Sequence, residues 1–125
     1  MLKYGHILMQ PPKPYREKRP WGEFVEFTRN TASTVKVITV KSGEALSLQR
    51  HAKRDEFWHV LSGEGFVTIG KDRVAAHPGA EYFAPHGTDH RIEGGTKPIS
   101  VLEISFGEFE DGDIVRLEDR YGRAK

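Results

Sequence analysis

Four side chains in this sequence have the chemical types and the spacing to hold one divalent metal ion. Gln49 and His51 lie two residues apart, so on a β-strand both side chains point to the same face. Glu56 follows a short polar turn that would bring it back on a neighbouring antiparallel strand, and His90 comes from a second hairpin later in the chain. A mixed set of nitrogen and oxygen ligands suits Zn, Mn, Fe, Co or Ni, and contains too much nitrogen for Mg or Ca. The sequence therefore predicts one divalent metal ion bound by Gln49, His51, Glu56 and His90.

The composition limits the kind of protein in which this site can lie. A length of 125 residues allows one domain with a real core, and the absence of cysteine excludes disulfides and thiolate ligands. The 19 basic and 18 acidic residues are mixed along the chain and give a net charge of +1, so we expect no nucleic-acid partner and no membrane-binding surface. No apolar stretch approaches the roughly 20 residues of a membrane helix, and the N-terminus lacks a signal-peptide pattern, so we predict a cytoplasmic protein.

The elements that must position these side chains are predicted to be β-strands. β-Branched and aromatic residues cluster in short runs that end at turn-forming residues, which is the pattern of an all-β protein. The predicted strands cover residues 24–27, 34–40, 46–51, 57–61, 65–69, 73–76, 81–84, 90–92 and 99–106, with turns at 62–63 and 70–72. Residues 112–119 are the one place where we expect a turn or two of helix. Many short strands at near-even spacing predict a closed antiparallel sandwich or barrel.

The N-terminal segment differs from the rest of the chain. Pro11, Pro12 and Pro14 exclude a helix or an inner strand there, because proline lacks the N–H that either would use. We therefore predict an extended N-terminal arm over residues 1–18 and a single domain over residues 19–125. The arm is expected to wrap the domain or to reach a partner subunit.

Two segments resemble the two sequence motifs of the cupin superfamily. The first motif is matched by Gly43, Gln49, His51, Glu56 and Gly63, and the second by Gly79, Pro85, Gly87 and His90. The usual asparagine near the end of the second motif is replaced by Gly94. The resemblance implies the cupin double-stranded β-helix, an all-β jelly-roll barrel. Because cupins commonly pair through their sheets, it also implies a homodimer, in which residues 11–14 would serve as an exchanged arm.

A finer resemblance is to the type II mannose-6-phosphate isomerases, which in many bacteria form the C-terminal part of a bifunctional enzyme with a mannose-1-phosphate guanylyltransferase. The matching segments are residues 19–22, 36–40, 46–51, 112–116 and 119–123. Gln49 stands where most cupins have histidine and these isomerases have glutamine, whereas Ala52, Lys53 and Phe57 replace histidines that the family often has. The resemblance implies a metal-dependent isomerase of carbohydrate metabolism that interconverts mannose 6-phosphate and fructose 6-phosphate through an enediol. No segment resembles the nucleotidyltransferase, so we expect no guanylyl transfer from this sequence.

This reaction needs a base and phosphate-binding groups as well as the metal. The metal would bind the carbonyl and hydroxyl oxygens of the sugar and stabilise the enolate, and a general base would move the proton. Because Glu56 is assigned to the metal, we predict Lys36 and Glu103 as the catalytic residues, since each places a charge inside a strand of apolar residues. The same two side chains could instead form a buried ion pair. The cations predicted to bind the phosphate of a small-molecule sugar phosphate are Lys53, Arg54 and Arg123.

Two other functions remain open at the level of sequence. His51, His90 and Glu56 form the two-histidine, one-carboxylate set of an Fe(II)-dependent cupin dioxygenase, although Gln49 and the C-terminal segment argue against it. A cupin without catalysis that binds a sugar or another metabolite is the other alternative. His59, three residues after Glu56, should point to the opposite face of the sheet and is interpreted as structural or interfacial.

Overall fold

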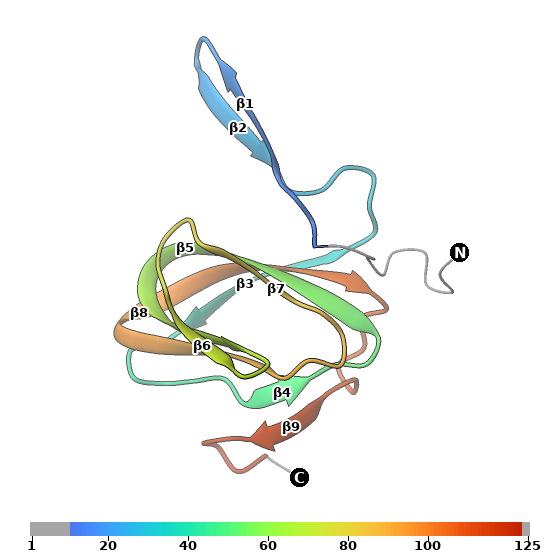
Figure 1. The fold of residues 1–125 in the computed structure, drawn as a ribbon, viewed down its shortest axis with the longest axis vertical. Coiled ribbons are helices and arrows are strands. Elements are labelled where there is room, and N and C mark those ends of the chain that lie inside the picture. Colours follow the sequence, from blue (N-terminus) through green and yellow to red (C-terminus); the bar gives the residue numbers. More distant parts are fainter. Residues whose placement is uncertain (1–10, 124–125) are drawn as a thin grey trace.

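The computed structural model describes residues 11–123, which form nine β-strands and contain no helix that could cross a membrane. In chain order the strands are β1 (Tyr15–Arg19), β2 (Gly22–Glu26), β3 (Thr34–Val40), β4 (Leu48–Arg50), β5 (Arg54–Ile69), β6 (Asp72–Ala76), β7 (Glu81–Ala84), β8 (His90–Gly107) and β9 (Val115–Glu118). They build two antiparallel sheets: the hairpin β1–β2 and a seven-stranded sheet that curves into a barrel (Figure 1). The predicted all-β class is confirmed.

Two long strands, β5 and β8, form the frame of the barrel. They pair with each other along most of their length, from Arg54 opposite Gly107 to Ile69 opposite His90. β8 also pairs with β3 and β4, and β5 also pairs with β6 and β7. The last strand, β9, pairs with β4 (Figure 1). Because both long strands bend around the barrel, side chains from distant points along them reach one interior.

The predicted turn at Ser62-Gly63 is wrong, because β5 continues through it. The register of β5 against β8 shifts between Val60 and Ser62 and again between Gly63 and Gly65, so the strand bends by β-bulges without reversing. Gly63 has a φ of 83°, and a Cβ atom there would lie 1.8 Å from the carbonyl oxygen of Pro98. Only glycine fits this conformation and this close approach, which explains why a turn-forming residue stands inside a continuous strand.

Two further expectations about local structure are corrected. Residues 90–92 and 99–106 belong to one continuous strand, β8. Residues 112–119 form no helical turn; they lead into β9, where Val115 and Arg116 pair with Arg50 and Gln49 of β4. Pairing with a strand more than sixty residues earlier in the chain decides the structure of this segment, and local sequence does not encode it.

The barrel interior has an apolar end and a polar end. Alternate residues of β8 point inward, and along the strand they change from Ile99 and Val101 to Glu103 and Ser105. The apolar end is filled by a buried cluster of Val40, Trp58, Val60, Val67, Ala76, Ile92, Ile99 and Val101. On the opposite face of the same strands, a second cluster comprises Phe57, Ile104 and Phe106, with Phe27 and Phe83 packed on it. Burial on both faces fixes the strands that carry the polar end.

The hairpin β1–β2 stands away from the barrel (Figure 1). Its turn carries Trp21, which is 70% exposed. After β2, Phe27 packs edge-on against the ring of His59 on the outer face of β5, with 5.2 Å between the ring centroids. Residues 15–18 of the predicted arm therefore belong to the strand β1, and residues 1–10 lie outside the described range. The division into an arm and a domain stays a prediction.

Candidate metal centre

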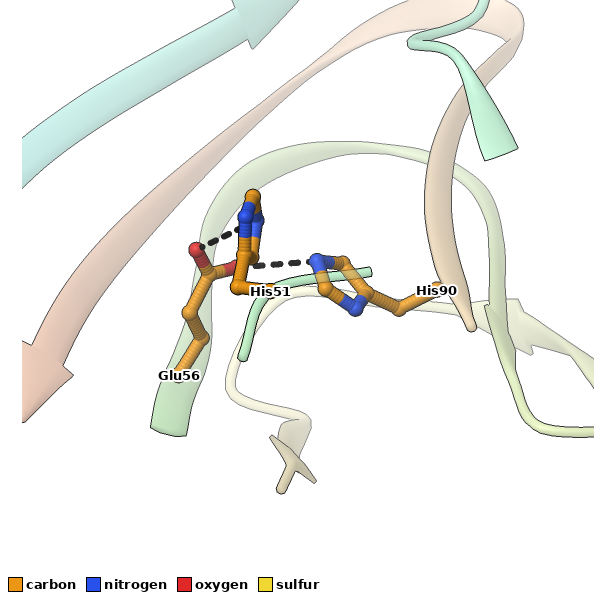
Figure 2. Close-up of side chains that lie close together, drawn as sticks. All are labelled: His51, Glu56 and His90. Carbon is orange, nitrogen blue, oxygen red and sulfur yellow. Dashed lines mark ion pairs between the residues drawn. The ribbon is translucent and has the colours of Figure 1, made fainter. Parts of the chain in front are cut away.

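Three of the four predicted metal ligands meet at the polar end of the barrel. His51 directly follows β4, Glu56 lies near the start of β5, and His90 is the first residue of β8. All three are buried, and one ligand atom from each lies within 4.8 Å of the others. Figure 2 shows both imidazoles next to the Glu56 carboxylate. Nε2 of His51 lies 3.2 Å from Oε2 of Glu56, and Nε2 of His90 lies 3.3 Å from Oε1. His51, Glu56 and His90 form the triad.

Backbone carbonyls set the orientation of both imidazoles. Nδ1 of His51 donates to the carbonyl oxygen of Asp113 at 2.7 Å, and Nδ1 of His90 donates to that of Thr88 at 2.9 Å. A carbonyl oxygen can only accept, so each Nδ1 carries a proton, and Nε2 is the ring nitrogen that faces Glu56. Groups that bind the second nitrogen of a histidine in this way hold the first nitrogen ready to coordinate a metal.

Several buried polar atoms at this end of the barrel lack hydrogen-bond partners within residues 11–123. They include Oε1 of Glu56, Nε2 of His90 and Oγ of Ser105, and Ser105 lies directly opposite Glu56 in the β5–β8 register. The contact between Glu56 and His90 has the distance of an ion pair but not the geometry of a hydrogen bond. A buried polar atom left unsatisfied costs about 1–3 kcal/mol, and a cation would satisfy the carboxylate and the imidazole together. The residues present therefore fit a divalent metal ion.

The fourth predicted ligand, Gln49, lies beside the triad on β4. It is directly opposite His90 in the β4–β8 register, and opposite residues of paired strands share a face, so both side chains are on the inner face. Its Oε1 accepts a hydrogen bond from Oγ of the buried Ser47 at 2.9 Å. Gln49 is thus placed next to the triad, with its amide oriented by Ser47.

Arg54, one of the predicted phosphate-binding residues, is buried beside the triad. Its Nε donates to Oε2 of Glu56 at 3.1 Å, and its Nη2 lies 3.2 Å from Nε2 of His51. The guanidinium also donates to the carbonyl oxygen of Glu110 at 3.3 Å and lies over the ring of Phe109, 4.3 Å from the centroid. These contacts orient the Glu56 carboxylate from inside the barrel.

The other two predicted phosphate-binding residues are near the surface and paired with carboxylates. Nζ of Lys53 lies 3.3 Å from both Glu108 and Glu110. Nε of Arg123 lies 2.9 Å from Asp119. No contact in the structure tests whether these residues or Arg54 bind a phosphate, so all three assignments stay predictions.

The two predicted catalytic residues lie opposite each other on paired strands, Glu103 on β8 and Lys36 on β3. Glu103 is buried and accepts a hydrogen bond from Nε1 of Trp58 at 3.3 Å. Lys36 is exposed, and its Nζ lies over the ring of Phe109, 4.3 Å from the centroid. Glu103 therefore belongs to the polar end of the barrel, whereas the side chain of Lys36 on β3 is exposed, and neither catalytic role is tested.

The protonation states of Glu56 and Glu103 depend on each other. Burial and the neighbouring Glu56 carboxylate raise the pKa of Glu103 to about 8. Burial also opposes ionisation of Glu56, but the neighbouring His51 and His90 outweigh it and hold the pKa of Glu56 well below its ordinary value. Near neutral pH the two carboxyl groups therefore carry one negative charge, on Glu56, and one proton, on Glu103.

Sequence reasoning missed the residues that hold the ligands in place. The carboxylate of Asp113 accepts hydrogen bonds from the backbone N–H groups of Ala52 and Lys53, both at 2.9 Å. The carboxylate of Asp55 accepts one from the backbone N–H of His86 at 2.7 Å, which ties the loop before β8 to β5. Asp113 lies in a segment that resembles the isomerase family, which was its only signal in the sequence, and Asp55 had none.

Comparison with known proteins assigns this barrel to a family. The sequence profile described as "Mannose-6-phosphate isomerase C-terminal" matches residues 13–119. The chain belongs to this family. Mannose-1-phosphate guanylyltransferase ManC of Salmonella typhimurium (strain LT2) is 39% identical over 107 residues, which are 84% of this chain and 22% of ManC. The chain thus spans about a fifth of the length of this curated relative.

Solved structures confirm the predicted cupin fold for this member of the family. A cupin protein from Bacteroides fragilis matches with a TM-score of 0.57 at 18% identity, covering 90% of this chain and 95% of that one. The dTDP-6-deoxy-D-glucose-3,5-epimerase RmlC from Legionella pneumophila matches with a TM-score of 0.63 at 13% identity, covering 84% of this chain and 69% of that one. At these identities the likeness shows the fold alone, which is the cupin jelly-roll barrel.

The predicted activity, by contrast, is contradicted. The chain was expected to be a mannose-6-phosphate isomerase, but its relative ManC is named a mannose-1-phosphate guanylyltransferase. The error has a physical reason: the spacing of Gln49, His51, Glu56 and His90 identifies a cupin barrel, and one fold carries many reactions. The motif therefore identified the domain correctly and the reaction incorrectly.

Proposed function

We propose that this chain is a metal-binding cupin domain in which Gln49, His51, Glu56 and His90 hold one divalent ion, which is Zn, Mn, Co, Ni or Fe(II). The supporting observation is the convergence of two buried Nε2 atoms and a buried carboxylate within 4.8 Å, with both Nδ1 atoms bound to backbone carbonyls. Two imidazoles with oxygen ligands match the preferences of these metals.

The polar end of the barrel suits a ligand rich in oxygen. When bound, the metal would supply a Lewis acid for oxygen atoms of a small molecule. Ser105 presents a hydroxyl without a partner in residues 11–123, so it can donate to such a ligand. We propose a sugar phosphate as the ligand; the name of the relative ManC specifies mannose 1-phosphate for that protein.

A homodimer and a cytoplasmic location complete the proposal. Val35 and Val37 on β3 are exposed apolar side chains, which supports an interface at this edge of the barrel. A monomer mass in light scattering at micromolar concentration would overturn the homodimer.

Metal binding is tested by calorimetric titration of chelator-treated protein with each of the five metals. The wild type is compared with His51→Ala and with His77→Ala, because His77 is exposed and outside the triad. We expect one equivalent of metal to bind to the wild type and to His77→Ala. His51→Ala should weaken binding by more than about a hundredfold, because losing a ligand costs more than losing a group that orients one. Equal affinities in the two variants, or no binding of any metal by the wild type, would overturn the proposal.

A further inference from the structure

Arg116, on the strand β9 next to Gln49, is a partly buried cation that has no partner among residues 11–123. The other three residues of β9 are exposed, among them Val115 at 51% and Leu117 at 39%, whereas Arg116 is turned toward the barrel. Its Nε is buried and makes no hydrogen bond, and within residues 11–123 its guanidinium forms no ion pair. Burying a charged group without a partner is costly, so this position favours the binding of an anion.

The strand register connects Arg116 to the metal centre. Gln49 on β4 lies opposite His90 of β8 and also opposite Arg116 of β9. Opposite residues of paired strands share a face, so the three side chains form a row along the inner face; Figure 1 shows β9 beside β4. Because neighbouring strands lie about 4.8 Å apart, the backbone of Arg116 is about 10 Å from that of the ligand His90.

A cavity of about 330 Å³ opens beside Arg116. Its lining residues are Asp111, Gly112, Ile114, Val115, Arg116 and Arg123. Gly112 and Ile114 flank Asp113, whose carbonyl oxygen binds His51, so one segment forms both the cavity wall and the support of the metal ligand. The volume lies at the lower end of the range that small-molecule ligands occupy.

We propose that Arg116 binds the phosphate group of a phosphate monoester whose oxygen atoms at the other end reach the metal centre. The inference rests on the proposed metal site and assigns the residue that would hold the charged end of its ligand. A guanidinium binds phosphate oxygens through two parallel N–H donors. Arg123 on the same cavity is already paired with Asp119, and Asp111 adds a carboxylate that can accept from a ligand hydroxyl.

The unpaired state of Arg116 distinguishes it from the cations that the sequence suggested. Lys53 is paired with Glu108 and Glu110, and Arg54 is paired with Glu56. A phosphate would have to displace a carboxylate from either residue. At Arg116 it would meet a guanidinium that no residue in 11–123 neutralises.

The test is calorimetry of the zinc-loaded protein with mannose 6-phosphate, mannose and inorganic phosphate. The variants are Arg116→Gln, Arg116→Lys and the charge-matched control Arg73→Gln, since Arg73 pairs with Glu93 on the surface. We expect Arg116→Gln to weaken binding of the ester at least about tenfold, because a charge-assisted hydrogen bond is lost. Its zinc affinity should be unchanged, and Arg73→Gln should match the wild type. The ester affinity of Arg116→Lys should lie between those of the wild type and Arg116→Gln, because lysine keeps the charge but loses the paired donors.

The outcomes separate this inference from the proposed function. Mannose and inorganic phosphate should each bind at least about tenfold more weakly than the ester, since each reaches only one of the two sites. The inference is overturned, while the zinc site stands, if Arg116→Gln binds the ester within twofold of the wild-type affinity. It is also overturned if the wild type binds inorganic phosphate as tightly as the ester. A wild type that does not bind zinc overturns the proposed function, and this is measured before any ester is added. Thermal unfolding verifies that each variant is folded; if Arg116→Gln is not, the ester affinity of Arg116→Lys decides.

Discussion

The carbonyl oxygen of Asp113 accepts the Nδ1 hydrogen of His51 at 2.7 Å, and the carboxylate of the same residue binds the next two backbone N–H groups after His51. One residue therefore fixes both the imidazole ring and the chain that leaves it. Asp113 reaches this position because β9, which begins two residues later, pairs with β4 immediately before His51. The C-terminal segment thus supports the triad although it supplies none of the predicted ligands.

Replacement of Asp113 by alanine should weaken the site without removing a ligand. The carboxylate that holds the Ala52 and Lys53 N–H groups would be lost, so we expect a loss of about 1–3 kcal/mol in the free energy of unfolding. The zinc affinity should fall about tenfold or more, because the ring of His51 is less well held. Urea unfolding and competition with a chromophoric chelator measure the two effects.

Asp113→Asn and Asp111→Ala are the controls for this prediction. The amide of Asp113→Asn keeps an acceptor oxygen for the turn, so this variant should recover part of the zinc affinity that Asp113→Ala loses. Asp111 is exposed and makes none of these hydrogen bonds, so its replacement should change neither quantity. Wild-type zinc affinity in Asp113→Ala would show that His51 is oriented without the turn.

Arg54 and its neighbour Lys53 should differ sharply in their effect on stability. Arg54 is buried and donates to Glu56, so Arg54→Met would leave a buried carboxylate without its guanidinium and should cost about 3 kcal/mol or more. Lys53 is paired at the surface, so Lys53→Met should cost less than about 1 kcal/mol. Urea unfolding of the chelator-treated variants measures both values. Similar small losses in the two variants would contradict a structural role for Arg54.

The sequence contains enough to predict that His51, Glu56 and His90 lie together, whereas their roles as metal ligands stay predictions. The period of two along a strand places Gln49 and His51 on one face. The strand predicted at residues 34–40 from its β-branched residues has the same bounds as β3. His90 was identified by the second cupin motif, and the structure places it against Glu56. Local patterns were therefore sufficient for the class of fold, and the two cupin motifs were needed for the residues of the triad.

What the sequence did not reveal depends on contacts between distant segments. The continuity of β5 through Gly63 depends on the carbonyl of Pro98, and the existence of β9 depends on its pairing with β4. The support of His51 comes from a backbone carbonyl, which any residue type at position 113 would present. Arg54 was predicted to bind a phosphate group because it lies in a charged turn, whereas its side chain points inward and donates to Glu56.

Two motif glycines should tolerate alanine very differently. Gly63 and Gly79 both have positive φ, at 83° and 87°, but a Cβ atom at Gly63 would overlap the Pro98 carbonyl oxygen, while nothing lies within 4 Å of one at Gly79. Gly79→Ala should therefore cost only the strain of the left-handed conformation, about 1–2 kcal/mol. Gly63→Ala should cost more than about 4 kcal/mol or prevent folding, because the β5–β8 ladder must open at the bulge. Thermal and urea unfolding compare the two, and equal losses would mean that the strands separate here without cost.

The raised pKa of Glu103 predicts how the stability of the metal-free protein depends on pH. Burial and the Glu56 carboxylate raise this pKa to about 8, above the ordinary value of 4.5 that applies in the unfolded chain. Between these values the folded state binds one more proton than the unfolded state, so this group's contribution to stability is fully present below the lower value and is lost as pH rises toward about 8. The side chain of Glu103→Gln cannot ionise, so this variant should lack the pH dependence. Urea unfolding from pH 5 to pH 9 measures the free energy of unfolding of both proteins. The wild-type value minus the variant value should fall as pH rises and then level off. Zinc should reduce the fall, because its positive charge favours the ionised carboxylate. A difference that is constant across this pH range would mean that Glu103 is already ionised in the folded protein.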